Sequence, residues 1–215
     1  MADEALSIGD IFGRLGEILR ENAGLAAGSV VGLTAINVAL DQISTGSGTA
    51  LPAGIASLAA QYYLTASALE RRGLREPDGR NRFGAFWWLN LVSALGIALG
   101  YILLIVPGLY LMVRWSTASA VLLAEGEGVS EALGGSGAIA ARSFWPILGA
   151  LLVIFVPAGV IGIGLAVAFE TSLPVVAPMI SYVFLFSAFV VSWLAAVSIY
   201  SLARPGQEHL AEVFA

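Results

Sequence analysis

The sequence predicts an all-α membrane protein, a polytopic bundle of six transmembrane helices arranged as three hairpins with interfacial amphipathic helices. Composition is the first observation, since 58% of the 215 residues are hydrophobic and 12% are charged, against roughly 45–50% and 25% in soluble domains. The second is that several stretches of about 18 or more residues carry no charge, which is typical of membrane spans. The third is that arginines gather in alternate connecting segments, as in multi-pass proteins.

The composition also excludes several kinds of chemistry. The chain has no cysteine and a single histidine, His209, in its polar tail, so disulfides, thiolate metal sites and thiol nucleophiles are excluded. Its net charge of −5 gives no sign of the basic patch that binds nucleic acid. The spans hold no pair of carboxylates and no Ser–His arrangement, so we expect no enzyme, no catalytic residue, no cofactor and no metal.

Residues 1–22 predict an amphipathic helix. Apolar side chains recur there at helical spacing, at Ile8, Ile11, Phe12, Leu15, Ile18 and Leu19. The helix either lies in the membrane interface or packs as a cytoplasmic helix on the remaining loops. The segment has no continuous apolar core, so we expect the first span, rather than a cleavable signal peptide, to direct targeting.

Six spans follow in a membrane domain that covers residues 23–203. The predicted ranges are 23–43, 53–69, 87–106, 109–124, 144–169 and 175–202. Polar segments at about 70–85 and 125–143 are predicted to form cytoplasmic loops, and residues 204–215 a cytoplasmic tail. Each hairpin is preceded by a polar, partly amphipathic segment, which makes three related helix–hairpin units plausible.

Proline sets the predicted helix breaks. The apolar stretch 86–124 is too long for one crossing of about 20 residues, so Pro107 and Gly108 are predicted to divide it into two spans. Pro157 removes a backbone donor within the fifth span and is predicted to kink it. If the stretch crossed only once, the protein would have five spans and its C-terminus would change sides, an alternative that the sequence leaves open.

The arginines predict the orientation. With a cytoplasmic N-terminus, nine of them fall in inner segments and none in outer turns: Arg14, Arg20, Arg71, Arg72, Arg75, Arg80, Arg82, Arg142 and Arg204. Because basic residues are enriched on the cytoplasmic side, both termini are predicted to be cytoplasmic.

Three runs of sequence carry a resemblance to a known family. They are Leu-Leu-Ile-Val-Pro-Gly-Leu-Tyr-Leu-Met-Val-Arg-Trp-Ser from Leu103, Leu-Leu-Ala-Glu-Gly-Glu-Gly-Val-Ser-Glu-Ala-Leu from Leu122, and Arg-Ser-Phe-Trp from Arg142. The chain thereby resembles bacterial multi-pass inner-membrane proteins that include the membrane domain preceding some glycerophosphoryl diester phosphodiesterases. The resemblance implies the fold and a bacterial cytoplasmic (inner) membrane location. It implies no activity, because that set is mostly without assigned function.

Two features limit what the resemblance implies. Its members commonly carry basic residues where this chain has Gly-Gly-Ser-Gly at 134–137. No phosphodiesterase domain follows within the 215 residues, so we expect none of that catalysis.

Arg114 is the one strongly charged residue that the prediction places inside a span. An intramembrane arginine costs at least about 2.5–3.5 kcal/mol on insertion scales, so it needs a partner or access to water. It either binds an anionic group such as a lipid phosphate in a cavity, or has a structural role by pairing or reaching outward. Asp41 and Glu170 are the predicted partners, since Glu125 lies eleven residues along the same helix, about 16 Å away.

The arginines of the loop after the second span have two interpretations. Near a membrane surface each contributes about 1 kcal/mol to binding of anionic headgroups, which makes them candidate headgroup contacts. Alternatively they only determine topology. The residues are Arg71, Arg72, Arg75, Arg80 and Arg82.

Small and polar residues within spans predict close helix packing. Gly24, Gly28 and Gly32, and likewise Gly96 and Gly100, recur every four residues, which favours intramolecular packing over a dimer seam. The polar side chains of Asn37, Gln61 and Asn90 either bond between helices or line a path.

The predicted function is that of a non-enzymatic integral membrane protein that binds lipid or a protein partner. Membrane lipids are the expected partners, a protein partner or homo-oligomer is possible, and nucleic acid is not expected. The alternative is a small transporter or channel for a small or anionic solute or lipid. Arg114, the prolines and the possible repeats suggest it, because interrupted helices in repeated halves often mark a substrate site.

Overall fold

Every element of the structure, a computed structural model that describes residues 6–43, 49–75, 82–169 and 176–204, is an α-helix. The all-α class is therefore confirmed. The helices are α1 (Ile8–Glu21), α2 (Ala23–Ile43), α3 (Ala50–Arg71), α4 (Phe83–Leu103), α5 (Ile105–Arg114), α6 (Ala118–Glu125), α7 (Val129–Phe169) and α8 (Val176–Ala203).

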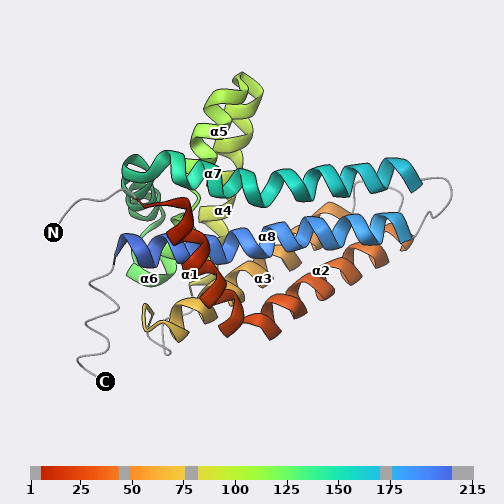
Figure 1. The fold of residues 1–215 in the computed structure, drawn as a ribbon, viewed down its shortest axis with the longest axis horizontal. Helices are drawn as coiled ribbons and strands as arrows, with labels where there is room; N and C mark the ends of the chain where they lie inside the picture. Colours follow the sequence, from red (N-terminus) through yellow and green to blue (C-terminus); the bar gives the residue numbers. More distant parts are fainter. Residues whose placement is uncertain (1–5, 44–48, 76–81, 170–175, 205–215) are drawn as a thin grey trace.

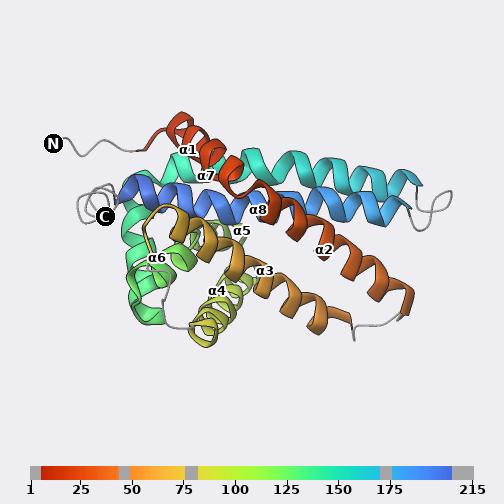
Figure 2. The same cartoon turned by 90° about the horizontal axis from the view of Figure 1, so that it is seen from below.

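Helix α8 is the centre of the bundle. It packs most extensively against α7 and also contacts α1, α2, α3 and α6, and Figures 1 and 2 show α7 and α8 running side by side along the long axis. All residues from Trp193 to Ser201 are buried. A helix that is apolar around its whole circumference needs such a position.

Five described helical segments are long and apolar enough to cross a membrane, which indicates a membrane-embedded protein. They are Ala23–Ile43, Phe83–Leu103, Ile105–Glu125, Val129–Phe169 and Val176–Ala203. Helix α3, which contains the predicted second span 53–69, has the length of a span but is not among the five. The six-span count therefore stays a prediction.

The break between α4 and α5 does not fall where proline predicted it, and α7 has a break that was not predicted. The break between α4 and α5 is at Leu104, whose φ of −164° and ψ of 149° are extended, and not at Pro107 and Gly108. In α7 the backbone departs from helical angles at Ser143, with φ −134° and ψ 35°, and not at Pro157.

Four prolines instead lie in first turns, whereas Pro157 lies in the interior of α7. Pro107 is the third residue of α5, and Pro146 is the third residue after the break at Ser143. Pro52 and Pro178 are likewise the third residues of α3 and α8. The first backbone N–H groups of a helix have no intrahelical acceptor, so a proline there loses no hydrogen bond.

Helices α4 and α5 form a tight hairpin. A Cβ at Gly100 would lie 2.8 Å from the Cα of Gly108, and one at Gly96 would overlap the Trp115 ring. The predicted intramolecular role of these glycines is thus confirmed for α4. At the hairpin tip, residues 102–106 are 68–79% exposed, and the tip projects away from the long helices (Figure 1).

The glycines of α2, in contrast to Gly96 and Gly100 of α4, make no close contact with another described helix. A Cβ at Gly24, Gly28 or Gly32 would meet nothing within 4 Å. This glycine stripe therefore lies on an open face and does not serve packing among the described residues.

Helix α1 packs on the membrane helices. Its buried residues are Ile11, Leu15 and Ile18, and it contacts mainly α8 and α7. The Ser198 Oγ of α8 donates to the Ile11 carbonyl at 2.9 Å. Ahead of α1, the Leu6 N–H donates to the Ser143 Oγ at 3.1 Å, so the break in α7 is also where the N-terminal segment docks.

Candidate functional site

A cavity of about 360 Å³ lies where α3, α4, α7 and α8 meet the junction between α5 and α6. This volume is at the small end of the range for ligand pockets, roughly 300–1,000 Å³. The lining residues are Ser57, Gln61, Leu89, Asn90, Ser93, Ala94, Ile97, Met112, Trp115, Ser116, Ala118, Ser119, Leu151, Phe155, Phe189, Ser192, Trp193 and Ala196.

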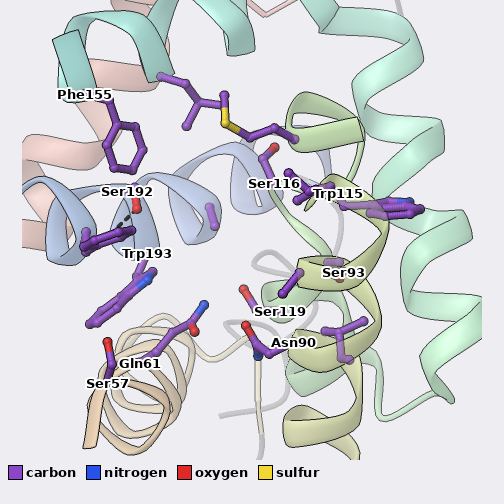
Figure 3. A pocket seen from close by; sticks show the side chains of 18 residues that line it. Ser57, Gln61, Asn90, Ser93, Trp115, Ser116, Ser119, Phe155, Ser192 and Trp193 are labelled. Carbon is purple, nitrogen blue, oxygen red and sulfur yellow. Dashed lines mark hydrogen bonds between the residues drawn. The ribbon is translucent and has the colours of Figure 1, made fainter. Parts of the chain in front are cut away.

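All 18 lining residues are uncharged (Figure 3). The polar ones bear hydroxyl, amide or indole groups. Figure 3 shows Gln61, Asn90 and Ser119 together on one side of the cavity and Phe155 on the opposite side. The lining thus combines amide and hydroxyl groups with aromatic rings, which an amphiphilic molecule can contact with both its polar and its apolar parts.

Some of the polar groups are already satisfied by their own helices. The Ser116 Oγ donates to the Val113 carbonyl at 2.9 Å, the Ser192 Oγ to the Phe189 carbonyl at 2.7 Å, and the Asn90 Nδ2 to the Phe86 carbonyl at 3.0 Å. These three side chains are therefore fixed in orientation.

Other polar groups keep their full hydrogen-bonding capacity. Within the described residues, no hydrogen bond is recorded for the side chains of Ser57, Gln61, Ser93 or Ser119. In the part of the chain that the structure describes, these side chains line the cavity with their polar groups unpaired, so they can bind a molecule that enters it.

A broken helix forms one wall. The segment Ile105–Glu125 has the length of a span, but helical structure stops after Arg114 and resumes at Ala118. Trp115 and Ser116, which lie in this break, line the cavity.

Ser136 of α7 bonds to backbone groups that the break leaves without helical partners. Its Oγ donates to the Arg114 carbonyl at 2.8 Å and accepts from the Thr117 N–H at 3.3 Å, while the Thr117 and Ser136 hydroxyls lie 2.8 Å apart. A Cβ at Gly135 would lie 3.1 Å from Val121, and one at Gly137 would lie 3.0 Å from the Arg114 Nε. The Gly-Gly-Ser-Gly run at 134–137 thus lets α7 approach the break.

Arg114, predicted as a binding residue, does not line the cavity. It ends α5, and its Nη1 donates to the Tyr110 hydroxyl at 2.8 Å, with the guanidinium 5.9 Å from the centre of that ring. Its side chain packs on Gly137. These contacts favour the structural interpretation of Arg114.

Of the two predicted partners of Arg114, Asp41 is bonded elsewhere. Asp41 accepts a hydrogen bond from the Tyr182 hydroxyl at 2.8 Å, which joins α2 to α8. Glu170 lies outside the described residues. Glu125 pairs with Arg204 at 3.3 Å, so it is not a partner of Arg114 either.

The loop arginines bind groups of the protein itself. Arg71 donates to the Glu21 carbonyl at 2.9 Å, and Arg72 pairs with Glu17 at 3.3 Å and Glu21 at 3.0 Å. These bonds tie the end of α3 to α1.

Two further loop arginines, Arg75 and Arg82, have similar internal contacts. Arg75 pairs with Glu70 at 3.4 Å, and the Arg82 Nη1 donates to the Leu122 carbonyl at 3.2 Å. Arg80 lies outside the described residues. The contacts favour the interpretation in which these arginines serve structure and topology.

Sequence reasoning found two of the polar cavity residues, Gln61 and Asn90, as side chains that might line a path. It missed Trp115, Trp193 and the serines. A serine within an apolar helix is common, so no signal in the chain distinguishes the serines that converge. Pro107, Gly108 and Pro157 do not line the cavity.

A comparison of the chain with protein families, curated proteins and solved structures found no match.

Proposed function

We propose that this chain is a non-enzymatic membrane protein that binds a lipid molecule within its helical bundle. The observation that carries the proposal is the uncharged cavity shared by five segments, with polar groups on one side and an aromatic ring on the other (Figure 3). Concave sites with a mostly apolar lining and a few polar groups are the usual binding sites for small molecules.

The membrane setting favours a lipid over a soluble ligand. The cavity lies among α4, α7 and α8, which are long and apolar enough to cross a membrane. Lipids are the most abundant small molecules in that environment. We place the protein in the bacterial inner membrane with both termini in the cytoplasm, which the arginine distribution and the family resemblance support.

The test is whether lipid stays bound to the purified protein. We expect native mass spectrometry of the protein in detergent to show a retained lipid. Ala94 is an exposed residue of α4 that lines the cavity, so Ala94→Trp should fill the site and abolish retention.

Matched variants make the test specific. Ala98 lies one turn further along α4, is also exposed and does not line the cavity, so Ala98→Trp should keep the lipid. Arg114→Gln should keep it as well. A wild-type protein without lipid, or equal retention in Ala94→Trp and Ala98→Trp, would contradict the proposal.

Transport is the second candidate function. The break between α5 and α6 borders the cavity, and transporters often build their substrate sites from interrupted helices. Reconstitution in liposomes separates the two functions. Lipid movement between leaflets that Ala94→Trp abolishes would support transport, whereas bound lipid without movement would support binding alone.

A further inference from the structure

We infer that the cavity selects a lipid whose head group is uncharged and bears at least one hydroxyl group. The inference rests on the proposed function, because it names the class of lipid that the same cavity would hold. It follows from the charges, the hydrogen-bonding groups and the arrangement of the cavity lining.

Charge excludes the common anionic lipids. A phosphate buried without an opposite charge is strongly disfavoured, and none of the lining residues is charged. The nearby cation Arg114 is bonded to Tyr110 and packed on Gly137. Arg82 donates to the Leu122 carbonyl instead. Neither arginine is among the residues that line the cavity.

The amides and hydroxyls specify the complementary group. The Asn90 Nδ2 donates to the Phe86 carbonyl, which fixes the orientation of the amide and leaves its Oδ1 available as an acceptor. Gln61 and Ser119 can each donate and accept. A hydroxyl group does both, whereas a quinone or ester carbonyl only accepts and an ammonium group only donates.

The arrangement of the lining places the head group. Gln61, Asn90 and Ser119 lie together, and Phe155 faces them across the cavity (Figure 3). A hydroxyl-bearing head would bind on the amide side, and the first part of the acyl chains would lie against Phe155. Diacylglycerol is the simplest lipid with this chemistry.

The experiment compares three lipids and glycerol on delipidated protein by native mass spectrometry. The probes are dioleoylglycerol, triolein with the hydroxyl esterified, dioleoyl phosphatidic acid with the hydroxyl phosphorylated, and glycerol as a head group without chains. We expect dioleoylglycerol to bind at least roughly tenfold more tightly than the other three, which one to two hydrogen bonds can provide.

Paired variants locate the site. Gln61→Leu should weaken dioleoylglycerol binding roughly tenfold, and Gln42→Leu, which removes the same amide from an exposed position of α2, should not. Asn90→Leu should also weaken binding. Its control is Asn37→Leu, because Asn37 makes the same bond to its own helix, at 2.9 Å to the Leu33 carbonyl, but does not line the cavity.

Each contrary outcome has a distinct meaning. Equal binding of phosphatidic acid overturns the selection against charge, and equal binding of triolein overturns the role of the hydroxyl, while lipid binding stands in both cases. Equal binding of glycerol overturns the lipid as ligand. Binding of no probe, in a wild type that also purifies without lipid, overturns the proposed function itself. If Gln61→Leu fails to fold, Ser119→Ala takes its place.

Discussion

Ser136 in α7 donates a hydrogen bond to the backbone carbonyl of Arg114 at 2.8 Å, across the break between α5 and α6. The same hydroxyl accepts from the Thr117 N–H at 3.3 Å. One side chain thus replaces helical hydrogen bonds that the break removes. Because Ser116 and Trp115 in this break line the cavity, the bond also fixes one wall of the candidate site.

Replacing Ser136 should destabilise the fold. Ser136→Ala leaves the Arg114 carbonyl and the buried Thr117 N–H without this partner, which costs about 1–3 kcal/mol. We expect a lower thermal midpoint in detergent. Ser130→Ala, at an exposed position of the same helix, is the control, and an equal midpoint in the two variants would show that Ser136 is dispensable.

The two glycine stripes should respond in opposite ways to alanine. Gly100→Ala places a Cβ 2.8 Å from the Gly108 backbone, so the hairpin must open and we expect a loss of about 1–3 kcal/mol. Gly28→Ala meets nothing within 4 Å and should gain up to about 1 kcal/mol from helix propensity. Thermal unfolding of both variants tests this, and a loss at Gly28 would indicate a contact with another molecule.

The ion pairs of Arg72 should hold α1 on the bundle. The side chains of Glu17 and Glu21 are 58% and 42% exposed, so Arg72→Ala should cost no more than about 1 kcal/mol. Amide hydrogen exchange measures how firmly α1 is held. We expect faster exchange in α1 for Arg72→Glu than for Arg72→Ala, and the double variant Arg72→Glu with Glu21→Arg should partly restore the protection of α1 from exchange. Arg20→Ala, at an exposed position of α1, is the control, and equal protection in all variants would argue against the ion pairs.

The pKa of Asp10 should lie below its ordinary value of 3.8, because the Ser7 side chain and then the Ser7 backbone N–H donate to its carboxylate. A depressed folded-state pKa gives a contribution to stability that is present above pH 3.8 and is lost as the pH falls through the folded value. An NMR titration should show a higher Asp10 pKa in Ser7→Ala. An unchanged pKa in that variant would contradict this cause.

Cysteine accessibility should decide the number of spans, since the chain has no native cysteine. Glu127 is exposed between α6 and α7, and the six-span prediction places it in the cytoplasm. Glu127→Cys should therefore resist a membrane-impermeant thiol reagent added to intact cells, whereas Gln42→Cys should react. Reaction of Glu127→Cys under the same conditions would support five spans. In that topology, the segments after α5 lie on the opposite side of the membrane from the six-span prediction.

The error in the predicted break at Pro107 has a physical cause, which also applies to Pro146 after the break in α7. Sequence reasoning treats proline as the point where a helix stops, yet Pro107 and Pro146 lie in first turns, where no intrahelical acceptor exists for their missing N–H. The breaks at Leu104 and Ser143 precede them by three residues. Leu104 and Ser143 are not conspicuous in the chain, so only the backbone shows them.

The sequence by itself determined the all-α class, the apolar segments and the absence of cysteine chemistry. These features depend on composition and helix length, because a lipid environment requires about 20 apolar residues whatever they pack against. Tertiary structure alone decided that Asp41 meets Tyr182, that Arg114 is held at a break, and that Gln61, Asn90 and Ser119 converge. Those outcomes depend on how helices from distant parts of the chain cross and rotate, which helical periodicity within one segment does not specify.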